Sequence, residues 1–155
     1  MTLTGVPAGC SSTNGLAGPA GLALDAQNET LYVAARDNCL VLAVNLGDGS
    51  TKVVAGGLAG SADGTGIAQF DHPTAIALDG LGNLYVADAG NATLRAVALP
   101  TGLVSTVARE LDQAGVLLGA VPKARTGRLT GLAFLPGTGL IGSVAQENAL
   151  LRIGR

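Results

Sequence analysis

Hydrophobic residues occur along this chain in short runs, and several of these runs alternate with polar residues. Glycine-rich segments such as Gly47-Asp48-Gly49 and Gly80-Leu81-Gly82-Asn83 separate the runs. Alternation with a period of two is typical of strands that bury one face, and Gly, Asn and Asp favour the backbone conformations of tight turns. The pattern therefore predicts an all-β fold made of many short antiparallel strands.

One group of predicted strands recurs along the chain. Residues 19–25 read Pro-Ala-Gly-Leu-Ala-Leu-Asp, residues 73–79 read Pro-Thr-Ala-Ile-Ala-Leu-Asp, and a weaker copy begins at Leu129. Each of the first two copies continues into three more apolar or alternating runs. Four antiparallel strands in a repeat of about 40–55 residues are typical of one β-propeller blade. We therefore expect three four-stranded blades in a single domain, at about residues 19–57, 73–109 and 129–155.

The segment from Gly60 to Ala108 carries the repeat in most detail. It reads Gly-Ser-Ala-Asp-Gly-Thr-Gly-Ile-Ala-Gln-Phe-Asp-His-Pro, followed by Ala-Ile-Ala-Leu-Asp, Asn-Leu-Tyr-Val-Ala-Asp-Ala-Gly-Asn and Leu-Arg. This segment strongly resembles the NHL repeat. The resemblance covers nearly all of the first two predicted blades and part of the third. It implies a β-propeller, commonly six-bladed, that serves mostly as a binding platform.

The polar residues of the repeat are not kept in every copy. The aligned residues are Asp88, Ala35 and Ala145 at the aspartate position, Arg95, Leu42 and Arg152 at the arginine position, and Asn38, Asn91 and Asn148 at the asparagine position. Asp88 and Arg95 are expected on neighbouring strands, where they form a structural ion pair. Such a pair contributes roughly 0–1 kcal/mol if it is exposed. Because neither residue recurs in all copies, a repeated polar function is not expected.

The third predicted blade ends after its third strand within this sequence, and residues 1–5 have the composition of an outermost strand. Blades of a propeller close into a ring by satisfying their edge hydrogen bonds. We expect a head-to-tail homodimer that forms a six-bladed ring. In it, Leu3 and Thr4 of one copy pair beside Leu150, Leu151 and Ile153 of the other. The alternative is that the chain is part of a longer propeller or of a larger assembly.

The longest predicted connection between blades covers residues 110–128. It combines an apolar run with basic residues, and loops on rigid scaffolds are frequent recognition sites. The candidate residues for binding another protein are Val116, Leu117, Leu118, Lys123, Arg125 and Arg128. The alternative is that this loop folds back over its own blade.

Charge and composition exclude several classes of function. Charged residues make up 13% of the chain and the net charge is −2, whereas nucleic-acid binding requires clustered Lys and Arg. His72 is the single histidine and the chain has no Gly-x-Ser-x-Gly sequence, so a hydrolytic triad lacks support. We therefore predict a non-enzymatic binding or scaffold module that uses no cofactor and binds a protein partner or a second copy, but not nucleic acid.

The alternative function is a degenerate metal-dependent propeller hydrolase or lyase. Propeller enzymes related to the NHL family often bind Ca²⁺ or Zn²⁺ in the central channel. Asp25 and Asp79 follow equivalent innermost strands and are the candidates for such a site. The favoured interpretation is that each starts the turn that follows it.

Cysteine use and targeting signals leave the compartment open. Cys10 and Cys39 allow one disulfide, and Asn28-Glu29-Thr30 and Asn91-Ala92-Thr93 are N-glycosylation sequons. The uncharged residues 1–24 have no basic segment typical of a signal peptide. The uncharged residues 129–146 are interrupted by the turn sequence Leu135-Pro136-Gly137-Thr138-Gly139, so we predict two strands there and no membrane span.

Overall fold

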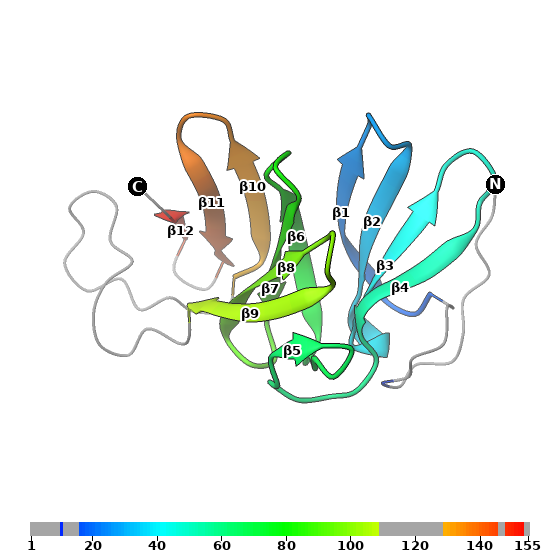
Figure 1. The fold of residues 1–155 in the computed structure, drawn as a ribbon. Coiled ribbons are helices and arrows are strands. Elements are labelled where there is room, and N and C mark those ends of the chain that lie inside the picture. Colours follow the sequence, from blue (N-terminus) through cyan, green and yellow to red (C-terminus); the bar gives the residue numbers. More distant parts are fainter. Residues whose placement is uncertain (1–9, 11–15, 109–128, 146–147, 154–155) are drawn as a thin grey trace.

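The computed structural model describes Cys10 and residues 16–108, 129–145 and 148–153. Three antiparallel sheets follow one another along this part of the chain (Figure 1). Blade 1 consists of β1 (Pro19–Asp25), β2 (Thr30–Ala35), β3 (Leu40–Asn45) and β4 (Thr51–Gly56). Blade 2 consists of β6 (Pro73–Leu78), β7 (Asn83–Asp88), β8 (Thr93–Ala98), β9 (Leu103–Ala108) and the added β5 (Gly64–Thr65). Blade 3 consists of β10 (Gly131–Leu135), β11 (Gly139–Val144) and β12 (Ala149–Ile153).

Consecutive strands pair within each blade, which confirms the predicted all-β propeller architecture. The β5 strand was not expected. It belongs to the connection between blades 1 and 2 and pairs with β9, so that it lies outside the four consecutive strands. Over the described residues, blade 3 has three strands, in the order β10-β11-β12. A short 3-10 helix, Arg36–Asn38, connects β2 to β3.

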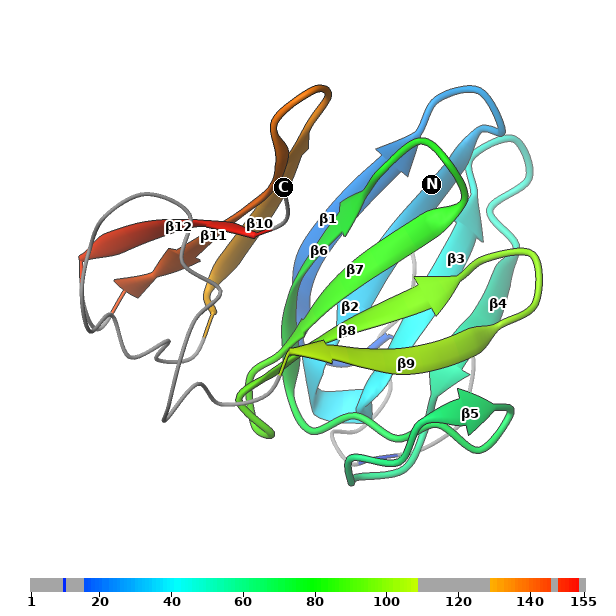
Figure 2. The same ribbon diagram turned by 60° about the vertical axis from the view of Figure 1, so that its left-hand side comes forward.

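The innermost strands of the three blades lie side by side, with β6 between β1 and β10 (Figures 1 and 2). Gly21 of β1 faces the backbone of β6 at this point. A Cβ atom at Gly21 would lie 2.7 Å from the Cα atom of Ala75, so the close approach of the two strands requires glycine. On the other side of β6, the Thr74 hydroxyl donates to the carbonyl of Leu129, 3.1 Å away.

Apolar side chains fill both boundaries between neighbouring blades. Between blades 1 and 2, the core includes Tyr32, Val41, Phe70, Ile76, Val86 and Val97. Between blades 2 and 3, the core is smaller and includes Ala77, Leu94 and Leu140, with Phe134 packed against them. Burial of this apolar area is what holds the blades together.

The two ends of the sheets differ in what connects the strands. The β1–β2, β3–β4, β6–β7, β8–β9 and β10–β11 turns share one end, which we call the turn face. The β2–β3 and β7–β8 turns and the connection from β4 to β6 share the opposite end, the crossover face, where β9 and β11 also end and β10 and β12 begin. None of the helices in the described parts of the chain is long and apolar enough to cross a membrane.

The register of blade 3 corrects the alignment of the third copy. Val144 pairs with Ala149 as Asp88 pairs with Thr93, so Val144, and not Ala145, has the position of Asp88. By the same register Leu151, and not Arg152, has the position of Arg95. The alignment of Asn148 with Asn91 is likewise wrong by one residue. Asn148 lies at the last position of its turn with a φ of 51°, as Ala92 does with a φ of 49°. Asn tolerates this left-handed conformation better than most residues.

Candidate functional site

Arg95 of β8 is the centre of a polar network at the crossover face of blade 2. Its side chain is completely buried. The Nη1 atom donates to the carbonyl oxygen of Gln69 at 2.9 Å and to Oδ2 of Asp88 at 3.0 Å. The Nη2 atom donates to the carbonyl oxygen of Ala62 at 2.8 Å and to Oδ1 of Asp63 at 2.7 Å. The predicted pair between Asp88 and Arg95 is therefore confirmed, but it is buried and tied to a loop.

The carboxylate of Asp88 accepts two further hydrogen bonds, one from the same loop and one from the β7–β8 turn of blade 2. Its Oδ1 atom accepts the backbone N–H of Asp71 at 2.6 Å, and its Oδ2 atom accepts a hydrogen from Nδ2 of Asn91 at 2.7 Å. The same Nδ2 atom donates to the carbonyl oxygen of Gly60, also at 2.7 Å. Asp88, Asn91 and Arg95 of blade 2 thus hold the connection from blade 1 at several points.

Asp63 closes the network from the loop side. Its carboxylate accepts the backbone N–H of Thr106 at 3.1 Å and the Thr106 hydroxyl at 2.9 Å, so the loop is also joined to β9. Burial acts to raise the pKa of Asp63, but the hydrogen bonds from Thr106 and the Arg95 guanidinium outweigh it and hold this pKa below 3.8. For Asp88, burial dominates and raises the pKa, against opposing hydrogen bonds from Asn91, Asp71 and Arg95.

The network also holds in place a segment that forms part of the molecular surface. Residues 57–72, which we call the 57–72 loop, cross from blade 1 to blade 2, and the Phe70 ring of this loop lies 5.3 Å from the Arg95 guanidinium. Two large apolar side chains of the same loop stay exposed: Leu58 by 63% and Ile67 by 70%. A rigid loop that presents apolar side chains is suited to binding another protein.

The equivalent end of blade 1 is closed by a disulfide. Cys10 is bonded to Cys39, which resolves the pairing that the sequence left open. Ala35 and Leu42 have the positions of Asp88 and Arg95, and both are completely buried in an apolar cluster. The backbone N–H of Ala17 donates to Oδ1 of Asn38 at 2.6 Å.

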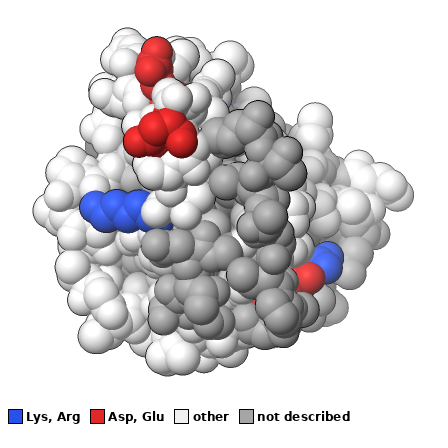
Figure 3. Space-filling view, turned by 90° about the vertical axis from the view of Figure 1, so that its right-hand side faces the viewer, with Lys and Arg blue, Asp and Glu red and all other residues white. Residues whose placement is uncertain are grey.

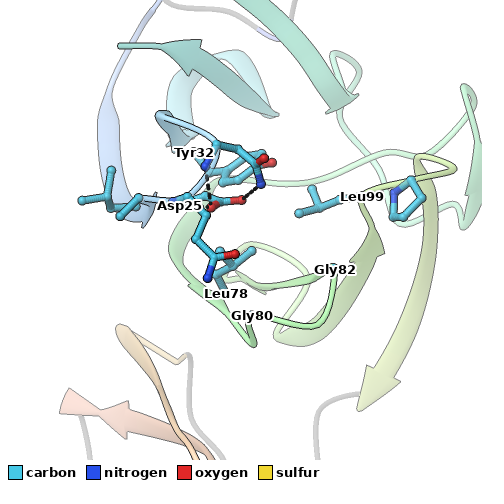
Figure 4. Close-up of a pocket in the computed structure, with 11 residues that line it drawn as sticks. Asp25, Tyr32, Leu78, Gly80, Gly82 and Leu99 are labelled. Carbon is cyan, nitrogen blue, oxygen red and sulfur yellow. Dashed lines mark hydrogen bonds between the residues drawn. The ribbon is translucent and has the colours of Figure 1, made fainter. Parts of the chain in front are cut away.

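A cleft of about 530 Å³ lies between blades 1 and 2 at the turn face (Figure 4). Asp25 and Tyr32 line it from blade 1, and Leu78, Gly80, Gly82 and Leu99 line it from blade 2. Burial raises the pKa of the Tyr32 phenol, and the nearby Asp25 charge adds to this effect. The cleft combines an apolar wall with one carboxylate.

Asp25 and Asp79, the candidates for a metal site, both bind the turn that follows them. Asp25 accepts the backbone N–H groups of Gln27 and Asn28, each at 3.2 Å, and the Asn28 side-chain amide at 2.8 Å. The hydrogen bond from the Asn28 side chain is the largest cause of a lowered pKa at Asp25, and the backbone N–H of Asn28 adds to it. Asp79 accepts the backbone N–H groups of Leu81 and Asn83 in the same way. The residues that the structure describes contain no cluster of three His, Cys, Asp or Glu side chains that would hold a metal ion.

The outward faces of blades 1 and 3 carry exposed leucines at positions that are buried between blades elsewhere. Leu22 of β1 is 62% exposed, although Ile76, at the equivalent position of β6, is 3% exposed. Leu150 of β12 is 77% exposed, although Leu94, at the equivalent position of β8, is 2% exposed. Around the outward side of blade 1, most of the described surface is uncharged (Figure 3).

Several residues singled out in the sequence lie outside the described residues, and others lie apart from the network. Outside are Leu3, Thr4, Val116, Leu117, Leu118, Lys123, Arg125 and Arg128. His72 is exposed, and its Nδ1 atom lies 2.5 Å from Oδ1 of Asp71. The predicted bounds of the first two blades leave Asp63 between them, as observed, but the sequence did not identify Asp63 as a partner of Arg95. No local pattern in the sequence signals this contact, which joins residues 32 positions apart.

Solved structures similar to this chain share its fold. One is an auxiliary nutrient binding protein from Bacteroides thetaiotaomicron, with 17% identity and a TM-score of 0.67 over 86% of this chain and 36% of that chain. A second, from Bacteroides ovatus, carries the same description, with 18% identity and a TM-score of 0.64 over 86% of this chain and 36% of that one. A third is a PQQ-bound aldose sugar dehydrogenase from Streptomyces coelicolor, with 20% identity and a TM-score of 0.51 over 91% and 41% of the two chains.

These similarities establish a β-propeller fold and, at this level of identity, nothing more specific. The chain spans about a third of the length of the first similar structure, 36%. No family model matches the sequence. No curated protein matches it either. The chain therefore consists of β-propeller blades whose fold is shared by binding proteins and by an enzyme.

Proposed function

We propose that this chain is a non-enzymatic binding or scaffold module, built from NHL repeats, whose crossover face binds a protein partner. The observation that carries the proposal is the 57–72 loop, which the Arg95 network holds rigid while Leu58 and Ile67 remain exposed. Asp88, Asn91 and Arg95 of blade 2 use their polar atoms to hold this loop. A fixed apolar surface loses little conformational entropy on binding.

The predicted binding residues between 116 and 128 lie outside the described residues, but both described ends of the connection that carries them reach the same face. Its described flanks, Ala108 at the end of β9 and Leu129 before β10, lie where the strands reach the crossover face. A partner that docks on Leu58 and Ile67 is therefore on the same side of the molecule as the ends of this connection. The basic residues Lys123, Arg125 and Arg128 would then favour a partner with an acidic surface.

We further propose that blades 1 and 3 pack against blades of a second copy and close a six-bladed ring. Leu22 and Leu24 of β1 and Leu150 of β12 are exposed by 62%, 57% and 77%. Burying such side chains is worth roughly 1.5–3 kcal/mol each. In this ring, Leu3 and Thr4 of one copy form the fourth strand beside β12 of the other, where blade 3 has three strands in the described chain.

Site-directed photo-cross-linking tests the docking proposal. A photoreactive residue replaces Ile67 on the crossover face, and a matched control replaces Leu81, which is 84% exposed on the turn face. We expect one discrete protein adduct from position 67 and none from position 81. The same adducts from both positions, or none from either, would contradict a partner site on the crossover face.

A mixing experiment tests the ring. Leu22→Glu and Leu150→Glu each damage one of the two complementary faces, so each variant alone should be monomeric. In an equimolar mixture, the intact face of one variant meets the intact face of the other, and part of the dimer should return. Leu81→Glu serves as the control and should keep the mass of the unaltered chain. If both face variants kept that mass, the ring proposal would be wrong.

A further inference from the structure

We propose that Asn28 is a site of N-linked glycosylation and that Asn91, the other asparagine in an N-x-T sequon, is not. Both sequons follow from the sequence, but the structure separates them. Asn28 lies in the exposed β1–β2 turn at the turn face, whereas Asn91 lies half-buried in the β7–β8 turn at the crossover face. The proposal does not depend on the proposed function.

The amide nitrogen of Asn28 has a hydrogen to spare. Its Nδ2 atom makes one hydrogen bond, to Oδ2 of Asp25 at 2.8 Å. A side-chain amide nitrogen carries two hydrogens, and glycosylation replaces one of them. The bond to Asp25 can therefore survive the modification. The hydroxyl of Thr30, the third sequon residue, lies at the start of β2 and donates to the carbonyl oxygen of Asn28 at 2.9 Å.

The amide nitrogen of Asn91 has no hydrogen to spare. Its Nδ2 atom donates to the carbonyl oxygen of Gly60 and to Oδ2 of Asp88, each at 2.7 Å. A glycan there would remove one of these bonds and place a bulky group against the 57–72 loop. The Arg95 network and a glycan on Asn91 therefore exclude each other.

The disulfide is an independent observation that points to the same cellular route. Cys10 and Cys39 are bonded, and the described chain has no free cysteine. Disulfides form and persist in oxidising compartments such as the lumen of the endoplasmic reticulum, where N-linked glycans are also attached. The cysteine pair and the accessible sequon belong to one blade, and both fit a chain that folds in that compartment.

The modification joins a sugar to Nδ2 of Asn28. The anomeric carbon of a lipid-pyrophosphate-linked oligosaccharide forms a bond to Nδ2, while its bond to the phosphate oxygen breaks and the lipid pyrophosphate leaves. Nδ2 releases one proton to the solvent, which balances the added negative charge of the leaving pyrophosphate and keeps the amide neutral. The attached glycan would extend from the turn face, which leaves the crossover face free.

The test uses the full 155-residue chain behind a secretion signal in a eukaryotic host, analysed by peptide mass spectrometry before and after endoglycosidase treatment. We expect one glycan, at Asn28, in the disulfide-bonded protein. Asn28→Gln and Thr30→Ala should abolish it, and Thr30→Ser should keep it because the sequon remains. Thr93→Ala removes the second sequon without touching the Asn91 amide, and should change nothing.

Two results would overturn the proposal. One is disulfide-bonded protein without a glycan at Asn28. The other is a glycan on Asn91 in protein that carries the Cys10–Cys39 bond. If the unaltered chain or the Thr93→Ala variant is not secreted, the same digestion is performed on the cell extract, where an unmodified Asn28 in disulfide-bonded protein counts equally against the proposal.

Discussion

Blades 1 and 2 close their crossover ends by different chemistry around the same backbone. In both blades, the backbone N–H that precedes the innermost strand donates to a side-chain oxygen at 2.6 Å: Ala17 to Asn38 in blade 1, and Asp71 to Asp88 in blade 2. In both, the carbonyl of that residue accepts a backbone N–H from the turn between the second and third strands. The backbone requirement is shared, whereas the side chain that meets it is not.

The means of holding the preceding segment also differ. Blade 2 uses the buried ion pair of Arg95 and Asp88 together with Asp63. Blade 1 has Leu42 in place of Arg95 and Ala35 in place of Asp88, and it uses the disulfide instead. A buried ion pair is costly to desolvate and contributes little unless every partner is present. The two blades therefore keep the same strand register although one is held by a polar network and the other by a disulfide and an apolar cluster.

The largest expected effect comes from replacing Arg95 of blade 2 with leucine, the residue that blade 1 has at the equivalent position. Arg95→Leu leaves the Asp88 carboxylate buried without its cation, and loss of one partner of a buried pair costs about 3–5 kcal/mol. We expect a loss of this size in the free energy of unfolding, measured by urea titration. The double variant Asp88→Ala with Arg95→Leu carries the residues that blade 1 has at these positions, Ala35 and Leu42. It should recover part of the lost free energy of unfolding. A double variant as unstable as the single one would refute the explanation.

Removal of the disulfide should have the next largest effect. Cys10→Ala with Cys39→Ala opens a loop with a sequence separation of 29 residues, and such bonds typically stabilise a protein by about 2–4 kcal/mol. Alanine suits position 39, because Ala92 has the same left-handed conformation in blade 2. We expect reductant to lower the unfolding midpoint of the unaltered chain but not that of the double variant. Equal midpoints for the oxidised chain and the variant would contradict this account.

A smaller effect is expected at Asn38. Asn38→Ala removes the acceptor of the Ala17 N–H, and an unsatisfied buried donor costs about 1–3 kcal/mol. Amide hydrogen exchange offers an internal control. Exchange at Ala17 should accelerate, while exchange at Asp71, which binds Asp88 in blade 2, should not. Equal acceleration at both amides would show that the two ends are not independent.

The smallest expected effect is on how the stability of the protein falls at acidic pH. Folding lowers the pKa of Asp63 below its ordinary value. The ionised Asp63 carboxylate therefore contributes its full stabilisation at a pH above the pKa of the unfolded chain, and this stabilisation is lost as the pH falls through the pKa of the folded chain. Asp88 has a raised pKa and acts in the opposite direction. Because the Asp63 side chain is 44% exposed, we expect less than about 1 kcal/mol. Asp63→Asn should flatten the fall in melting temperature below pH 4, and an unchanged slope would count against this role.

The strands could be predicted from the sequence because they depend on local alternation and on turn residues. The Asp88 and Arg95 pair could be predicted for the same reason, since the two residues are seven positions apart on paired strands. Asp63 could not, because it meets Arg95 across 32 residues and no local pattern encodes that contact. The register of blade 3 was misjudged because Asn148 resembles Asn91 in type but serves the turn by its backbone conformation.

The exposure of Leu22 and Leu150 also could not be read from the sequence, because their equivalents Ile76 and Leu94 are buried. Residue type alone does not distinguish an inner blade from an outer one. Only the arrangement of the three sheets shows which apolar faces meet a neighbour (Figure 2).

The central claim is that the outward faces of blades 1 and 3 are surfaces made for packing against another blade. Light scattering on the unaltered chain over a range of concentrations tests it most directly. Two copies of the 15.2 kDa chain should form a particle of about twice that mass, with the monomer returning on dilution. A mass of 15.2 kDa at every concentration would contradict the claim.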